Sequence, residues 1–503
     1  MLLVVQLIFL VVAAQAAMAR DLCQLGECEC NGVVASCSGQ DIKVEDPIIH
    51  IHSNLSPPQL VPSQLNPRLE KLTLTGTSLS LLGSSQFFDY TELITLDMSD
   101  NHVAQIADLT FRFQHRLTSL NLSHNSIPSL THLSLTGLSA LKTLDLSHNL
   151  LVGRLEPGIF DPLTSLASLN LGHNRIHSLD QKVFAALPKL ENLSLRNNPL
   201  GPNISPHLFL PTSIISLNLA STELNEVPIF ELPHLRSLQL TGNPLGNIPE
   251  KALANLNLLE SLDLSNTSLA YLPPLALLPS IIHLDLSHNQ IPNVKNMAAL
   301  PNLKKLLLSH NPFMMYVHTP AMEKLTFLSL SHSPRLSSWT SDPLPSLHHL
   351  DLRQSAPNLP SPSLLPSITS LKMAGSLYTC DCGFKPWRDL LASLPPLSRD
   401  SPLCSKGTPL ASSSFPHCAS PPSSLVLGLG IGLLLLLIIL AGVTFHHRSR
   451  AAILLRHVRG CRASEEGVAY QRQALQQEDY WLSLARRAQA RPDPGTPVPV
   501  TEL

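Results

Sequence analysis

Leucine residues at regular spacing organise the chain between residues 69 and 376. The nine-residue segment Leu-x-x-Leu-x-Leu-x-x-Asn, in which Ile or Met replaces some leucines, recurs there at steps of 21 to 25 residues. Its fourteen copies start at residues 69, 93, 117, 141, 166, 190, 214, 235, 259, 281, 303, 325, 347 and 368. Alternating apolar and polar positions in the central Leu-x-Leu predict a short β-strand in each copy, with its leucine side chains facing inward.

A single copy cannot bury its apolar side alone, so the copies must stack into one elongated solenoid with a continuous core. The Asn at the ninth position is suited to bonding backbone groups in the turn that it closes. Thr or Ser replaces this Asn in six copies, and the copies after about residue 270 are shorter and richer in Pro. One solenoid explains why 503 residues need not form three or four ordinary domains.

Two apolar runs lie outside the repeats. Residues 2–12 are nearly all apolar and precede Ala17-Met18-Ala19, which predicts a cleaved signal peptide. An uncleaved anchor is the alternative, but this run is short for a bilayer. Residues 425–445 carry no charge and, as a helix, would span roughly 32 Å, enough for a membrane. Arginines follow this second run at once, which predicts a cytoplasmic C-terminus.

Eight of the nine cysteines form two groups that flank the repeats, and the ninth, Cys461, follows the second apolar run. The groups are Cys23, Cys28, Cys30 and Cys37, and Cys380, Cys382, Cys404 and Cys418. Even numbers in tight groups favour disulfides formed in an oxidising compartment. Zinc is the alternative, but the one-residue gaps are shorter than the usual zinc-ligand spacing.

The cysteine groups, with Trp387 shortly after Cys382, resemble the N- and C-terminal caps of the extracellular leucine-rich-repeat superfamily. Together with the repeats and the single apolar span, they are similar to single-pass type I members, over residues 23 to about 418. The resemblance implies that, within each cap, the first cysteine pairs with the third and the second with the fourth. The implied disulfides are Cys23–Cys30, Cys28–Cys37, Cys380–Cys404 and Cys382–Cys418. The sequence alone permits three pairings in each cap.

The expected fold class is an α/β-type leucine-rich-repeat solenoid, a curved parallel sheet with an irregular convex side and disulfide caps. One transmembrane helix and a short, largely disordered tail complete it. The expected boundaries are a signal peptide at 1–19, an N-terminal cap and lead-in at 20–68, repeats at 69–376, a C-terminal cap at 377–418, a stalk at 419–424, a transmembrane helix at 425–445 and a cytoplasmic tail at 446–503.

On a strand of this kind the non-leucine positions face the concave side, which we expect to bind a ligand in a long, shallow groove. Histidine stands at the eighth position in His124, His148, His173, His288, His310 and His332, and aspartate at the fifth in Asp97, Asp145, Asp263, Asp285 and Asp351. A histidine column could switch binding with pH or hold a metal. We favour the simpler interpretation that Leu-Ser-His-Asn is common filler of this repeat on an exposed strand face.

Five Asn-x-Ser/Thr sequons predict N-glycosylation on the luminal side: Asn54, Asn121, Asn192, Asn203 and Asn266. Proline follows the sequon at Asn54 and at Asn203, which lowers modification. A glycan on Asn121 would lie on the concave strand face. Asn192 and Asn266 are the strongest candidates.

Composition and motifs argue against an enzyme. Charged residues are 14% of the chain and the net charge is −2, so no global charge attracts nucleic acid. The sequence has no Gly-x-Ser-x-Gly elbow, His-Glu-x-x-His motif or phosphate loop. We therefore expect no catalytic residues, no cofactor and no resident metal. The 58-residue tail is too short for a kinase or for the signalling domain of Toll-like receptors.

The tail and the apolar span contain three candidate interaction features. The terminal Thr501-Glu502-Leu503 is similar to the C-termini that PDZ domains capture by strand addition. Cys461, among arginines, is a palmitoylation candidate or an idle thiol. Gly428 and Gly432 are spaced for packing two transmembrane helices into a homodimer.

The expected function is that of a plasma-membrane glycoprotein with its N-terminus outside. It would bind a protein ligand or a partner cell, as an adhesion molecule or co-receptor, and recruit a scaffold through its C-terminus. The alternative is a regulator in the secretory pathway or at the surface that binds and retains a client, such as a growth factor or receptor.

Overall fold

The computed structural model describes residues 68–410, apart from 77–78, 203, 210–212, 296, 298–299, 356, 397–401 and 406. It also describes positions 434 and 437 and the backbone of three strands near the N-terminus, β1 (Cys28–Asn31), β2 (Val34–Cys37) and β3 (Ile48–His52). The chain divides into two units, Met1–Phe415 and Pro416–Leu503. The expected signal peptide and cytoplasmic tail, with Gly428, Gly432, Cys461 and the C-terminal tripeptide, lie outside the described residues, as does the expected transmembrane helix apart from positions 434 and 437. Within the described part, no helix has both the length and the apolar character needed to cross a membrane.

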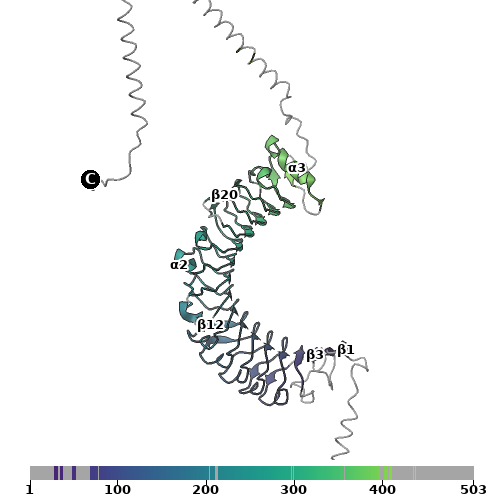
Figure 1. Ribbon diagram of the computed structural model, residues 1–503, viewed down its shortest axis with the longest axis vertical. Coiled ribbons are helices and arrows are strands. Elements are labelled where there is room, and N and C mark those ends of the chain that lie inside the picture. Colours follow the sequence, from purple (N-terminus) through teal and green to yellow (C-terminus); the bar gives the residue numbers. More distant parts are fainter. Residues whose placement is uncertain are drawn as a thin grey trace, which may run out of the picture. The chain divides into compact units, whose positions relative to one another are not determined.

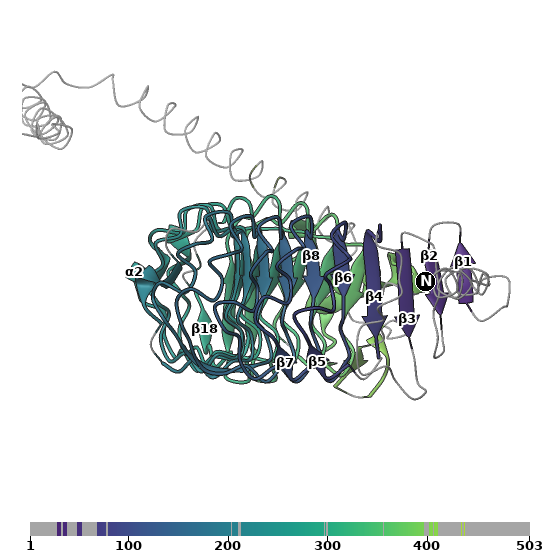
Figure 2. The same ribbon diagram turned by 90° about the horizontal axis from the view of Figure 1, so that it is seen from below.

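The described residues form one long sheet of 17 strands, in which each of the fourteen predicted copies contributes one strand. After β3 these strands are β4 (Lys71–Thr75), β6 (Thr95–Asp97), β8 (Ser119–Asn121), β9 (Thr143–Asp145), β11 (Ser168–Asn170), β13 (Asn192–Ser194), β14 (Ser216–Asn218), β15 (Ser237–Gln239), β16 (Ser261–Asp263), β17 (His283–Asp285), β19 (Lys305–Leu307), β21 (Phe327–Ser329), β23 (His349–Asp351) and β24 (Ser370–Lys372). Neighbours from β2 onward pair in parallel, and the central leucine of one strand lies opposite that of the next, as Leu120 does opposite Leu144. Figure 1 shows the sheet along the inner side of the curved repeat stack, and Figure 2 shows β3, β4, β6 and β8 side by side.

The convex side is built from short elements rather than long helices. It contains α2 (Glu250–Leu253), the 3₁₀ turns η1 (Pro206–Phe209), η2 (Leu275–Leu277) and η3 (Pro362–Leu364), and the parallel strand groups β5 (Leu81–Leu82) with β7 (Gln105–Ile106), β10 (Val152–Leu155) with β12 (Arg175–Leu179), and β18 (Asn293–Val294) with β20 (Tyr316–Thr319) and β22 (Ser338–Ser341). Because proline lacks the backbone donor that a longer helix needs, it fits these short turns. The leucines of the strands and of these elements form one continuous buried core, as the repeat predicted.

The ninth-position asparagines are buried and join each copy to the one before it. The Asn149 side-chain amide donates to the carbonyl oxygens of Leu122, at 2.8 Å, and of Leu146, at 3.1 Å. Its Oδ1 accepts from the backbone N–H of Ile127 at 3.0 Å. The predicted bonding within the asparagine's own turn is confirmed. The structure adds a lateral set of bonds between copies, because Leu122 and Ile127 belong to the preceding one.

The C-terminal end of the stack is covered by β25 (Leu377–Tyr378), η4 (Cys382–Phe384), α3 (Lys385–Ser393) and β26 (Leu403–Cys404). A disulfide joins Cys380 to Cys404 with their Cα atoms 5.5 Å apart, one of the pairings that the resemblance implies. Cys382 is also disulfide-bonded. Trp387 is 2% exposed and its indole N–H donates to the Pro360 carbonyl, so α3 seals the last leucine layer.

At the other end, β1 and β2 form an antiparallel hairpin whose Cα register places Cys28 opposite Cys37. The resemblance implies a disulfide between these two residues. The backbone register is the arrangement that such a pairing needs, while Cys23 and Cys418 lie outside the described residues.

We predict that Asn289→Ala lowers the free energy of unfolding by roughly 3 kcal/mol, because several buried backbone groups lose their partner at once. The Asn289 amide donates to the Leu264 and Leu286 carbonyls, and its Oδ1 accepts from the Thr267 and Leu269 N–H groups. Urea unfolding followed by circular dichroism measures the change. The exposed Asn257→Ala is the matched control, which should change stability by less than about 0.5 kcal/mol. Equal effects of the two variants would contradict the structural role of the ninth position.

Candidate functional site

The concave face of the sheet is polar and made of short side chains. In most strands the first and third residues are partly or fully exposed and the central leucine is buried, as in β8 and β16. Serine, threonine, asparagine and aspartate fill most of these outward positions. All five fifth-position aspartates end a strand on this face, where the sequence placed them.

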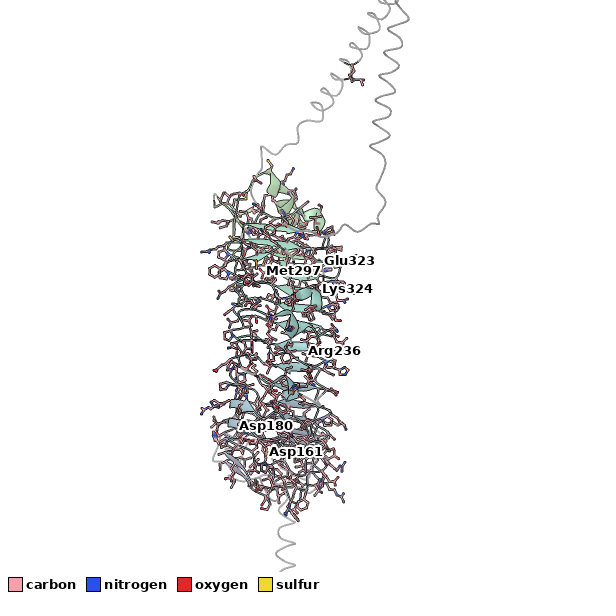
Figure 3. The ribbon with its side chains drawn as sticks, turned by 90° about the vertical axis from the view of Figure 1, so that its left-hand side faces the viewer. Asp161, Asp180, Arg236, Met297, Glu323 and Lys324 are labelled. Atoms are coloured by element: carbon pink, nitrogen blue, oxygen red, sulfur yellow. A yellow bond between two sulfur atoms is a disulfide. The ribbon has the colours of Figure 1, made fainter. Side chains whose placement is uncertain are left out.

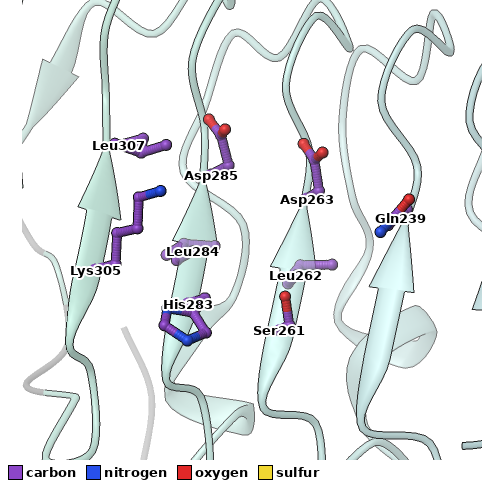
Figure 4. A pocket seen from close by; sticks show the side chains of 9 residues that line it. All are labelled: Gln239, Ser261, Leu262, Asp263, His283, Leu284, Asp285, Lys305 and Leu307. Carbon is purple, nitrogen blue, oxygen red and sulfur yellow. The ribbon is translucent and has the colours of Figure 1, made fainter. Parts of the chain in front are cut away.

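A hollow of about 340 Å³ opens on this face, across four adjacent strands from β15 to β19. Figure 4 shows its lining: Gln239, Ser261, Leu262, Asp263, His283, Leu284, Asp285, Lys305 and Leu307. Asp263 and Asp285 occupy the same position on neighbouring strands, and Lys305 lies one strand further along. The hollow therefore combines two adjacent carboxylates with one ammonium group at its side.

The electrostatics of the hollow centre on Asp285. Burial raises the pKa of its carboxyl, and the neighbouring Asp263 raises it further, whereas hydrogen bonds from Ser287 and the charge of Lys305 act in the opposite direction. The backbone N–H of Ser287 donates to Asp285 at 2.8 Å, and that of Ser265 donates to Asp263 at 2.9 Å. These bonds hold both carboxylates in place, so the hollow is suited to a cationic group such as a lysine or arginine side chain.

The eighth-position histidines lie elsewhere than the sequence placed them. We expected an exposed strand face, but each histidine follows its strand by three residues, in the turn beyond it. All fourteen eighth positions have positive φ, between 53° and 75°: Gly76, Asp100, His124, His148, His173, Asn197, Ser221, Gly242, Asn266, His288, His310, His332, Gln354 and Gly375. Asn, Asp, His and Gly tolerate this left-handed conformation better than most residues, which accounts for most of the residue types found there.

The histidine rings form two stacks along this row of turns. Ring centroids lie 4.1 Å apart from His124 to His148 and 4.0 Å apart from His148 to His173. The second stack repeats the arrangement, with 4.1 Å from His288 to His310 and from His310 to His332. The sequence showed the column of histidines but not the stacking. The recurrence of Gly, Asn, Asp and His at one position was the signal for the left-handed turn.

Three of the predicted sequons fall on described residues. Asn192 begins β13 and is exposed, and Asn266 is exposed at an eighth position. Asn121 is half-buried on the concave face, where its Oδ1 accepts from the Ser123 N–H at 3.0 Å. Asn54 and Asn203 lie outside the described residues. In the described part of the chain, no group of three His, Cys, Asp or Glu side chains is arranged to hold a metal ion.

A family model of the leucine-rich repeat matches residues 67–224 and 233–291, in overlapping segments. These stretches of the chain are leucine-rich repeats. No curated protein matches its sequence. Among solved structures, a chain of the glycosylated Toll–Spatzle complex of Drosophila is similar at 20% identity and a TM-score of 0.50, over 74% of this protein and 64% of that chain.

Two other solved chains also show similarity to this protein. A chain of the TLR13–ssRNA13 complex has 24% identity and a TM-score of 0.49, and the match covers 71% of this protein. The protein spans only 54% of that chain's length. A leucine-rich-repeat protein of Leptospira interrogans has 22% identity and a TM-score of 0.49, over 67% of this protein and 96% of its own length. At these identities the similarity concerns the fold alone.

We predict opposite pH effects for two aspartate variants. Because the folded-state pKa of Asp285 is raised, its ionisation costs stability as the pH rises through that pKa. Asp285→Asn should therefore raise the unfolding midpoint at pH 7.5, by an amount that shrinks as the pH falls towards 4. Asn121, Asn170 and Asn218 show that asparagine keeps the backbone hydrogen bond at this position.

Asp180 on the convex side is the matched comparison. A hydrogen bond from the Lys182 backbone, and then the Arg154 side chain, lower its pKa, so its stabilisation is present at neutral pH and is lost as the pH falls through the folded-state pKa. Asp180→Asn should lower the unfolding midpoint at pH 7.5. Thermal unfolding between pH 4 and 7.5 compares the variants, and shifts of the same sign at pH 7.5 would contradict the assignment.

Proposed function

We propose that this protein is a cell-surface leucine-rich-repeat glycoprotein that binds a protein ligand or a partner on another cell, as an adhesion molecule or co-receptor. It would lie in the plasma membrane as a single-pass type I protein, with the repeats outside. The two apolar runs, the flanking arginines, the cysteine groups and the luminal sequons support this orientation. The repeat fold is typically non-catalytic, which agrees with the absence of catalytic motifs from the sequence.

The observation that carries the binding proposal is the hollow between β15 and β19 on the concave face. It lies within a polar surface that extends along the sheet on both sides, so a folded protein ligand would make many contacts around it. Asp263 and Asp285 would receive a basic side chain of the ligand, and Leu307 adds an apolar contact beside them. The near-neutral net charge favours a protein ligand over nucleic acid.

The alternative function is retention of a client protein in the secretory pathway or at the cell surface. It would use the same concave surface, and the membrane span would serve only to hold the complex in place. Surface biotinylation of cells that express the full chain separates the two. The adhesion or co-receptor proposal requires abundant protein outside the cell, whereas retention in the secretory pathway predicts that most of it stays inside.

We predict that Asp263→Asn combined with Asp285→Asn reduces ligand capture by roughly ten- to a hundred-fold, because a hydrogen bond to a charged group contributes about 1.5–3 kcal/mol. Proximity labelling on intact cells that express the full chain measures the captured partners. Glu323→Gln is the matched control, since Glu323 is exposed on the segment between β20 and β21 and is labelled in Figure 3. An identical set and yield of partners with both variants would exclude the hollow as the ligand site.

A further prediction concerns scaffold recruitment through Thr501-Glu502-Leu503. Adding one glycine after Leu503 moves the carboxylate by about 3.5 Å and should abolish PDZ binding. Thr501→Ala removes one hydrogen bond, worth ~0.5–1.5 kcal/mol, and should weaken binding several-fold. Proximity labelling from the tail compares wild-type and variant chains. Identical PDZ proteins around all three tails would mean that the C-terminus recruits none of them, while extracellular binding should be unchanged in every case.

A further inference from the structure

Each histidine stack forms a short ladder whose geometry the repeat imposes. The backbone N–H of each of the six histidines donates to the seventh-position carbonyl of the next copy, as His148 does to Gly172 and His310 does to Ser331. Neighbouring turns are thereby held at the spacing of the strands, and successive rings lie nearly parallel, within 12°. Three rings at these distances extend about 8 Å from the first centroid to the last (4.1 + 4.0 Å in the first stack).

The surroundings of three of the rings, His148, His173 and His310, disfavour the charged form of the imidazole. Partial burial and then repulsion from neighbouring histidines lower the pKa of His310, while for His173 the histidines and Arg196 add to burial. Burial and the neighbouring His124 lower the pKa of His148, whereas Asp145 acts in the opposite direction. The Nδ1 atoms of His310 and His332 are buried and have no hydrogen-bond partner among the described residues.

The other groups that face the stacks are few. His124 Nδ1 lies 4.0 Å from Asp100 at one end of the first stack, and His173 Nδ1 lies 3.0 Å from the Asn197 amide at the other. Asp351 is the carboxylate that acts on the second stack. These carboxylates are fewer than the six rings, so protonation in acid would leave an excess of positive charge along this edge.

We propose that the two histidine stacks are an acid-dependent binding edge for the carboxylates of an acidic protein surface. Acid favours the imidazolium form of histidine, and carboxylates placed along the stack would neutralise that charge while accepting hydrogen bonds from the imidazolium N–H groups. By linkage, a bound carboxylate favours protonation and protonation favours the bound carboxylate. At neutral pH both the charge and the attraction disappear, so the edge releases its partner.

The arrangement favours a protein partner over a continuous polyanion. The stacks are separated by four copies whose eighth positions are uncharged, namely Asn197, Ser221, Gly242 and Asn266. A long nucleic acid or sulfated glycan would have to cross this gap and the predicted glycan on Asn266. Two short patches, each matching two or three carboxylates, suit a folded acidic surface better. The proposal does not rest on the identity of the ligand at the concave hollow.

The test uses the untagged full chain in detergent and a fluorescent hexaglutamate peptide in 150 mM NaCl. Binding should be at least tenfold tighter at pH 5.5 than at pH 7.4. His148→Asn combined with His310→Asn should bring the affinity at pH 5.5 down to that of the wild type at pH 7.4. Asparagine already occupies this turn at residues 197 and 266, so the backbone conformation is kept. His177→Asn with His234→Asn, both exposed and outside the stacks, is the matched control and should bind as the wild type does.

Calorimetry of the wild type at pH 6.0, in two buffers with different ionisation enthalpies, provides a measurement that needs no variant. Peptide binding should be accompanied by uptake of at least one proton. Equal affinity at the two pH values, binding that survives in the stack variant, or binding without proton uptake would each overturn the proposal. The same binding measurement is made with a single-stranded oligonucleotide and with heparin as alternative ligands. If either binds in acid while the peptide does not, the partner class assigned here is wrong.

Discussion

The amide of the ninth-position asparagine is the interaction on which the rest of the structure depends. A turn inside a solenoid buries backbone N–H and carbonyl groups that water can no longer reach, and each one left unpaired is costly. One asparagine side chain, as at Asn149, donates to two carbonyls and accepts from an N–H of the preceding copy. The strands can therefore be only three residues long and still stack in register. Where Thr222 replaces asparagine, its hydroxyl bonds its own turn and the neighbouring Asn243 completes the set.

This ladder also accounts for the surface chemistry. To bring the ninth side chain under the turn, the backbone at the eighth position adopts a left-handed conformation, and its side chain projects beside the sheet. Copies are spaced by the strand separation of ~4.8 Å, which is close to the stacking distance of flat rings. Histidines placed there in consecutive copies must therefore stack. Histidine tolerates the left-handed turn, and its repetition in neighbouring copies produces a row of titratable rings.

The same regularity leaves the concave face free for recognition. The inward leucines form the core and the buried asparagines bond the backbone groups of the turns. The fold therefore places few constraints on the residues at the outward positions of the strands. Serine, threonine, asparagine and aspartate fill most of these positions, while Asp263, Asp285 and Lys305 concentrate charge around one hollow. Asp285 is held partly buried with its pKa raised by that burial, an arrangement that stability alone does not favour.

The sequence by itself determined the repeat, the inward leucines, the strand in each copy and the role of the ninth asparagine, because these follow from a local pattern repeated many times. The cysteine pattern, through family resemblance, also pointed to the observed Cys380–Cys404 bond. The repeat pattern placed the eighth-position histidines on the strand, which was wrong, because their position depends on the φ angle of a turn. Only the tertiary structure decided the ring stacks, the hollow and the burial of Asp285. Each of these arises between residues 20 to 25 positions apart in the chain, and lateral packing of the copies, not the local pattern, brings such residues into contact.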